Sequence, residues 1–163
     1  MTEAEFLPLF DRYRSMVYGL ALSYTRSPQD AEDICQEVFL TLLETPPAPG
    51  KERPWLAKGT VNRCRDLLAS PWKKRREEAD AALERLSFQE PEEAGLFAAL
   101  GELEPEYRAL LHLRYYEGFS AAELARQFGT TAPALSARLY RAKRQLRKKL
   151  EELGYEEAVS KNL

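Results

Sequence analysis

Residues 120–150 read SAAELARQFGTTAPALSARLYRAKRQLRKKL, and this stretch decides how the C-terminal half of the chain folds. Ser120 and Glu123 have the spacing of a capping box, which predicts the start of a short helix. Gly129 can adopt the left-handed conformation that ends such a helix. Thr131, followed by Pro133, predicts the start of the next one. Two helices joined by a glycine turn at this spacing indicate a helix-turn-helix.

The last helix of this motif has two different faces. At about 100° per residue, five apolar side chains fall on one narrow arc: Leu135, Leu139, Ala142, Leu146 and Leu150. The residues that face away from this arc are Ala137, Tyr140, Arg141 and Arg144, flanked by the basic residues Arg138, Arg147 and Lys148. This pattern is what a major-groove helix requires, and the alternative is an ordinary amphipathic helix of a bundle.

Charge is arranged in blocks along the 163 residues, although the net charge is only −2. Residues 51–76 hold nine basic and two acidic side chains, and residues 131–150 hold seven basic side chains and no acidic one. Acidic residues dominate segments 1–50 and 77–107. The two basic blocks can follow a phosphate backbone, whereas the acidic blocks repel it.

Several classes of protein are not expected. No run approaches the roughly 18 apolar residues of a membrane helix, and the N-terminus MTEAEFLPLF lacks the features of a secretory signal. Cys35, Cys64 and the single histidine His112 do not form a metal-ligand or nucleophile motif. We therefore expect a cytoplasmic protein that is not an enzyme, with no metal, no cofactor and no membrane insertion.

Helix signals also dominate the N-terminal half. Aromatic and aliphatic residues recur at spacings of three and four between Phe6 and Tyr24, which predicts a long first helix. Ser27, as an N-cap, starts a second helix that reaches about Glu44. The proline-rich stretch 45–50 predicts a loop, and a third helix opens at Pro54 and reaches about residue 69.

The second helix divides into an apolar and a polar side. Its apolar arc is expected to face a core and contains Ala31, Ile34, Cys35, Val38, Leu42 and Leu43. The opposite side carries Asp33, Gln36 and Glu37, with Leu40 among them. This side is either a simple solvated face or an acidic docking stripe with one exposed leucine for a basic partner.

The third helix combines an aromatic, an amide and two cations on one side: Trp55, Lys58, Asn62 and Arg65. Cations hold phosphate, an amide can read a base edge, and an aromatic can stack on an unpaired base. This combination favours nucleic-acid binding. Trp55 is equally consistent with a buried core position.

Together these signals predict an all-α protein with two small helical domains. We expect an N-terminal domain over 1–76 and a flexible acidic linker over 77–93. A helix-turn-helix domain is expected over 94–155.

Three separated blocks resemble a known family, the bacterial sigma factors of the extracytoplasmic-function type within the sigma-70 family. They are residues 30–39 (DAEDICQEVF), then Trp55-Leu56 with Asn62 and Asp66, then 103–108 (LEPEYR), 113–118 (LRYYEG) and the helix-turn-helix. The resemblance covers nearly everything from Phe6 to Leu150. It implies a protein that brings RNA polymerase to promoters and helps to open the −10 region.

The resemblance also implies roles for particular residues. Asp33, Gln36 and Glu37, with Leu40, would dock on the β′ coiled coil of core polymerase, and the β flap is a second expected contact. The third-helix residues Trp55, Lys58, Asn62 and Arg65 would act at the −10 element, with the 45–53 loop holding a flipped base. The −35 element would face Thr131, Ala137, Arg138, Tyr140, Arg141 and Arg144. Such proteins commonly have an anti-sigma partner.

The chain departs from the family pattern in the recognition helix. It has Pro133-Ala134-Leu135 where Gly-Thr-Val is usual, and Ala137-Arg138 where Ser-Arg is usual. The −35 sequence therefore cannot be transferred from relatives. Two other functions stay open: a helix-turn-helix regulator without sigma activity, and a sigma-like protein that mainly binds proteins.

Overall fold

The computed structural model describes residues 1–69 and 91–154, and this part of the chain contains helices and no strand. The predicted all-α class is therefore confirmed. Contacts divide the chain into two compact units, Met1–Leu83 and Glu84–Leu163. The structure makes one correction to the expected linker over 77–93: residues 91–93 already belong to a helix, and 77–90 lie outside the described residues.

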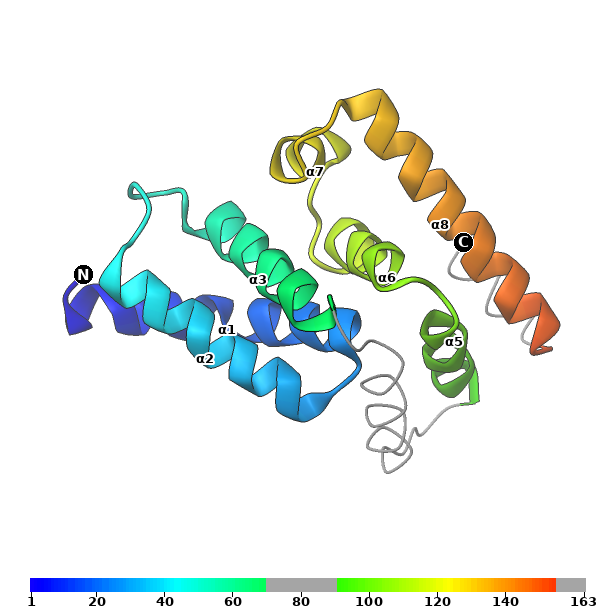
Figure 1. The fold of residues 1–163 in the computed structure, drawn as a ribbon, viewed down its shortest axis with the longest axis horizontal. Coiled ribbons are helices and arrows are strands. Elements are labelled where there is room, and N and C mark those ends of the chain that lie inside the picture. Colours follow the sequence, from blue (N-terminus) through cyan, green and yellow to red (C-terminus); the bar gives the residue numbers. More distant parts are fainter. Residues whose placement is uncertain (70–90, 155–163) are drawn as a thin grey trace. The chain divides into compact units, whose positions relative to one another are not determined.

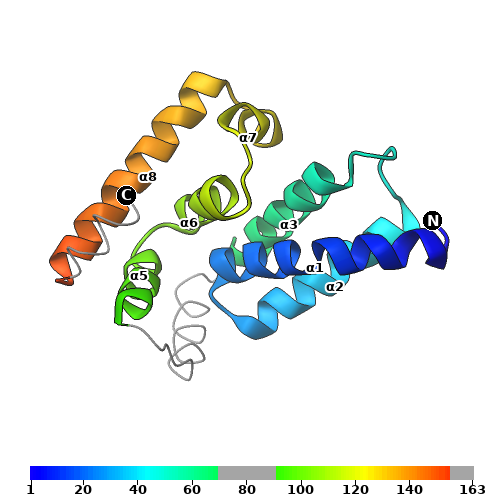
Figure 2. The same cartoon turned by 180° about the vertical axis from the view of Figure 1, so that it is seen from behind.

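The first unit contains three helices, α1 (Glu3–Thr25), α2 (Pro28–Glu44) and α3 (Glu52–Leu68). Helix α1 packs against both of the others, which Figure 1 and, from behind, Figure 2 show. The core lies among the three helices because each contributes one apolar side to it. Its fully buried side chains include Val17, Leu20, Val38, Leu42 and Leu56.

The junction between α1 and α2 follows the signals in the sequence. Arg26 ends α1 in the left-handed conformation, with φ of 54°, and its N–H donates to the Leu22 carbonyl at 2.7 Å. The Ser27 hydroxyl then accepts a hydrogen bond from the Asp30 N–H at 3.2 Å. The predicted N-cap and restart are confirmed.

The buried side of α2 is wider than its periodicity indicated. Phe39 is 3% exposed because Phe6 and Phe10 of α1 cover it, with ring centroids 6.2 and 5.0 Å away in edge-on geometry. Leu43, which we expected in the core, is only half-buried. The core therefore reaches the first turns of α1 through an aromatic cluster.

Helix α3 begins earlier than expected. It starts at Glu52 rather than at Pro54, with Lys51 as the N-cap residue. Proline is tolerated within a first turn because its missing N–H has no intrahelical partner there. The Lys51 carbonyl accepts the first hydrogen bond, from the Trp55 N–H at 3.2 Å.

The second unit contains α5 (Pro91–Gly101), α6 (Pro105–Leu111), the π-helical turn η1 (His112–Tyr116), α7 (Ala121–Gln127) and α8 (Ala132–Glu152). Figure 1 shows α7 and α8 in sequence as the last two helices of the chain. All five residues of the predicted apolar arc of α8 are buried. Part of this arc packs against α5. In that part of the core, Ala142, Leu146 and Leu150 of α8 are buried in one cluster with Ala99 of α5 and with Leu103, which follows α5.

The turn between α7 and α8 has the predicted chemistry. Ser120 and Glu123 form both hydrogen bonds of a capping box, each 3.1 Å long. Gly129 has φ of +64°, a conformation that glycine adopts without the strain of a Cβ atom. Thr131 caps α8 by accepting from the Ala134 N–H at 3.2 Å. The helix-turn-helix is confirmed.

The π-helical turn η1 had no signal in the sequence. The Glu117 N–H donates to the carbonyl of His112 at 3.0 Å, five residues back along the chain. The His112 ring stacks on Tyr116 with centroids 4.9 Å apart. Burial of the ring lowers the pKa of His112 to about 4 and outweighs Glu117 Oε1, which lies 3.2 Å from its Nε2.

This buried histidine predicts acid sensitivity of the second unit. The unfolded chain binds a proton at His112 near pH 6.5, whereas the folded chain does so only near pH 4. Stability is therefore complete above pH 6.5 and falls as the pH drops through this window, by about 2.5 kcal/mol at pH 4.5. Urea unfolding at pH 7 and pH 4.5 should show a smaller acid-induced loss for His112→Gln than for the unmodified chain. Equal losses would show that this ring does not carry the effect.

Candidate polymerase and promoter surfaces

The polar side of α2 forms a continuous exposed stripe. We use the name acidic stripe for Asp33, Gln36, Glu37 and Leu40, all of which are exposed. Leu40 is 57% exposed, a larger fraction than for the exposed leucines Leu7 (48%) and Leu153 (46%). The buried arc on the other side fixes the orientation of the helix, so the stripe faces outward.

One side chain of α3 reaches the edge of this stripe. Arg63 places its Nε 3.6 Å from Glu37 Oε2, and its Nη2 donates to Thr41 Oγ1 at 2.5 Å. Sequence reasoning did not single out Arg63. Helical periodicity orders residues within one helix, whereas Arg63 and Thr41 are 22 positions apart on two helices.

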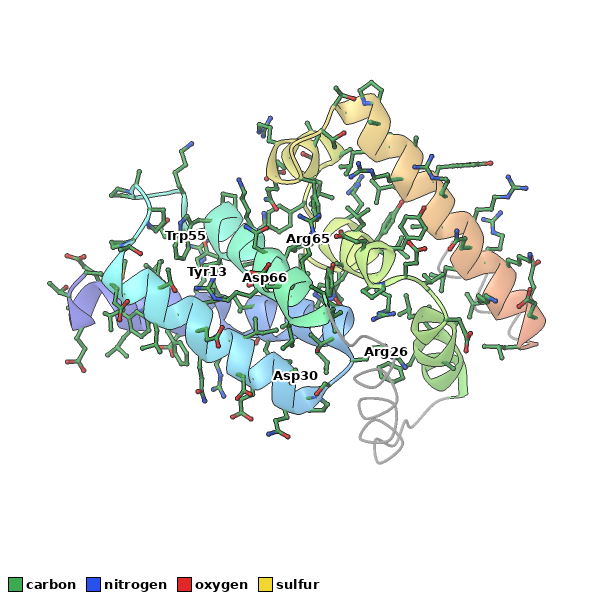
Figure 3. All side chains as sticks on the ribbon, viewed as in Figure 1. Tyr13, Arg26, Asp30, Trp55, Arg65 and Asp66 are labelled. Carbon is green, nitrogen blue, oxygen red and sulfur yellow. The ribbon has the colours of Figure 1, made fainter. Side chains whose placement is uncertain are left out.

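The polar side of α3 exposes three of its four predicted residues. Lys58, Asn62 and Arg65 are exposed, whereas Trp55 is half-buried. Figure 3 shows Trp55 near the start of the helix and Arg65 towards its end. Trp55 therefore combines the two alternatives: part of the ring packs against the unit and part remains accessible. The face offers two cations, an amide and an aromatic edge along one helix.

A short loop joins α2 to α3. Thr45 ends α2, with its N–H donating to the Thr41 carbonyl at 2.8 Å. Lys51 N–H donates to the Ala48 carbonyl at 3.1 Å, and Gly50 has φ of +86°. Three prolines in between restrict the backbone further. The loop is thus a defined turn that joins the end of α2 to the start of α3.

The exposed side of α8 is rich in basic side chains. Ala137, Tyr140, Arg141 and Arg144 are exposed, with Tyr140 at 66%, and Arg138 is half-buried. Thr131, at the N-cap, is exposed as well. The buried leucines on the other side hold this face outward along the whole helix.

Two features of this surface were not expected from the sequence. An open hollow of about 450 Å³ runs along α8 and is lined by Tyr140, Lys143, Arg144, Arg147, Lys148 and Glu151. The exposed Tyr115 of η1 also lies under two cations, with the Lys143 nitrogen 5.2 Å and the Arg114 guanidinium 5.5 Å from its ring centroid. The Lys143 contact joins η1 to α8, whereas Arg114 lies within η1 itself.

Comparison with known proteins identifies the family. Sigma-70 region 2 matches residues 9–74, and Sigma-70, region 4 matches residues 95–146. The ECF RNA polymerase sigma factor SigL of Mycobacterium tuberculosis is 30% identical, over 90% of this chain and 89% of SigL. This chain belongs to the sigma-70 family.

Two further comparisons agree with this assignment. The RNA polymerase sigma factor SigV of Bacillus subtilis is 31% identical, over 90% of this chain and 91% of SigV. The fold is similar to that of the sigma factor RpoE from Bartonella quintana, solved in complex with the anti-sigma factor NepR. The TM-score is 0.69 at 19% identity, covering 90% of this chain and 97% of that one. The protein is thus a sigma factor of the extracytoplasmic-function type, which directs core RNA polymerase to promoter DNA.

The two family regions contain the surfaces described above. The acidic stripe and the polar side of α3 fall in region 2, and the exposed residues of α8 as far as Arg144 fall in region 4. A helix-turn-helix regulator without sigma activity leaves the region 2 match without a role. Among residues 1–69 and 91–154, no group of side chains is arranged to hold a metal ion. Within the same residues, no helix is both long and apolar enough to cross a membrane.

Proposed function

We propose that the sigma factor docks on core polymerase through the acidic stripe, acts at the −10 element through α3 and reads the −35 element through α8. The observation that carries this proposal is the two-sidedness of α2. Its apolar side is buried in the core of the first unit, whereas its other side presents two carboxylates, an amide and a leucine that is 57% exposed.

The docking partner proposed for the acidic stripe is the β′ coiled coil of core polymerase. A basic surface with an apolar patch complements the stripe: charges of opposite sign steer the encounter, and Leu40 then loses its contact with water. The β flap is the proposed polymerase contact of the second unit.

At the −10 element, we propose that α3 and the preceding loop share the work. Lys58 and Arg65 hold phosphates, Asn62 reads a base edge and the accessible part of Trp55 stacks on an unpaired base. The 45–53 loop is the proposed site for the flipped base. Each base-pair step costs about 1.4 kcal/mol to unstack, and a stacked or captured base returns about 1–3 kcal/mol. The unstacking cost applies to every base-pair step that opens, whereas the proposal has one base stacked on Trp55 and one held by the loop. Melting therefore needs the polymerase as well.

At the −35 element, the proposed contacts are those of a recognition helix in the major groove. Arg138, Arg141 and Arg144 supply cations for phosphate or guanine, and Tyr140 and Ala137 supply apolar contact. Thr131, at the helix start, supplies a hydroxyl. The missing serine at position 137 indicates that the −35 preference differs from that of relatives with Ser-Arg there.

The proposal extends to the organisation and regulation of the chain. The docking domain covers 1–76, and the −35 domain begins with α5 at Pro91 and extends to about 155. Sigma factors are initiation factors, and RNA synthesis is carried out by the polymerase. We therefore propose that this chain contributes no catalytic residue. We also propose that it acts in the cytoplasm. An anti-sigma factor is the proposed regulatory partner, since the similar RpoE was solved with one.

Transcription with purified core polymerase on a promoter library tests this function. We expect transcripts from a specific subset of promoters only when both the chain and core polymerase are present. A gel shift of the chain alone should show weak DNA binding, because the acidic residues of the first unit oppose it. Tight and specific promoter binding without polymerase, or no transcript from any promoter, would contradict the proposal.

A further inference from the structure

A side-chain bridge joins the docking helix to the promoter helix. We use the name Arg63 bridge for Arg63 of α3 with Glu37 and Thr41 of α2. Arg63 Nε lies 3.6 Å from Glu37 Oε2, and Arg63 Nη2 donates to Thr41 Oγ1 at 2.5 Å. Thr41 Oγ1 in turn donates to the Glu37 carbonyl at 2.9 Å. The guanidinium is thus held at one turn of α2 by two different partners.

The exposure of the two charged groups differs, and this difference matters. The Arg63 side chain is 29% exposed, whereas that of Glu37 is 65% exposed. Arg63 is therefore the more enclosed of the two groups. Glu37 still presents most of its carboxylate to solvent and can accept a second cation from a partner.

We propose that Arg63 is a positioning residue that holds the Glu37 carboxylate in the orientation needed for polymerase docking. This inference rests on the proposed docking role of the acidic stripe. An ion pair this exposed adds little to folding stability. Arg63 acts instead by restricting the conformations of the Glu37 side chain before docking. Without Arg63, the Glu37 side chain loses this conformational freedom only when the polymerase binds, and the entropy cost weakens binding.

The chemistry of arginine fits this role better than that of lysine. A planar guanidinium presents several N–H donors in fixed directions, so one group can contact the carboxylate and the threonine hydroxyl together. A lysine ammonium is a compact point charge that keeps the attraction to Glu37 without this fixed geometry. Arg63→Lys should therefore retain part of the effect, and Arg63→Leu none of it.

The test measures the affinity of full-length variants for core polymerase by competition with a labelled sigma factor. Arg63→Leu is expected to weaken binding about three- to tenfold, the size of one side chain's ordering cost. Arg63→Lys should fall between this variant and the unmodified chain. Arg12→Leu, which removes an exposed arginine of α1, is the matched control and should leave the affinity unchanged.

A double-mutant cycle separates positioning from a general structural effect. In a chain carrying Glu37→Gln, adding Arg63→Leu should cause little further loss, because the carboxylate that Arg63 orients is gone. If Arg63→Leu fails to fold, Arg63→Gln is measured in the same cycle. An equal loss in both backgrounds, or no loss from Arg63→Leu while Glu37→Gln weakens binding, overturns the role of Arg63. If Glu37→Gln itself leaves the affinity unchanged, the docking role of the stripe fails instead.

Discussion

Replacing Asp33, Gln36 and Glu37 together by alanine is expected to weaken binding to core polymerase by about 100-fold or more, since a few central residues carry most of an interface's binding free energy. The three side chains are exposed and take no part in the core of the first unit. Alanine is the strongest helix former, so α2 should remain intact. Transcription from every cognate promoter should fall in parallel with binding, because promoter selection depends on recruitment.

Competition for core polymerase and in vitro transcription measure this effect, and circular dichroism shows whether the helix content is preserved. A matched control is the double variant Glu5→Ala and Asp11→Ala, which removes the same number of negative charges from exposed positions of α1. It should bind core polymerase normally. Normal binding by the α2 triple variant would show that this side of α2 is only a solvated face.

The second large effect is expected in the recognition helix. Replacing Arg141 and Arg144 by alanine removes two exposed cations from the side of α8 opposite its buried leucines. A base contact by arginine contributes about 1–3 kcal/mol of discrimination, so the loss of two such contacts should reduce −35-dependent initiation by about 30-fold or more. Binding to core polymerase through the first unit should be unchanged.

The dependence of this loss on promoter sequence and on salt concentration distinguishes contacts to bases from contacts to phosphates. If an arginine reads a base, the relative use of promoters changes; if it holds a phosphate, all promoters weaken together and the salt dependence becomes less steep. Lys149→Ala is the control, because Lys149 lies near the C-terminal end of α8 and pairs with Glu152 at 3.4 Å. Unchanged initiation in the double variant would remove α8 from the −35 contact.

Local chemistry explains how much of the fold could be predicted. Ser27, Ser120 and Thr131 each cap the helix that the sequence assigned to them, and Gly129 takes the expected left-handed turn. These features depend on a few neighbouring residues. The apolar arc of α8 was equally predictable, because one helix supplies the whole pattern.

Features that depend on distant residues were missed. Phe39 is buried only because two α1 rings cover it, and Arg63 gains its role from a carboxylate on another helix. Trp55 stayed ambiguous because periodicity cannot measure partial burial. The roles of the acidic stripe came from family resemblance, since an exposed face has no internal partner that reveals its use.

The π-helical turn η1 has a consequence for reading related sequences. Its five-residue hydrogen-bonding step places one more residue in this turn than an α-helix does. A helical wheel drawn with continuous 3.6-residue periodicity from α6 through η1 would therefore misplace residues at the end of this segment by up to about 100°. Tyr115 and Tyr116 would then be assigned to the wrong side of the helix. The sides of the helix on which these two tyrosines lie therefore follow from the π-helical geometry and not from a regular α-helical pattern.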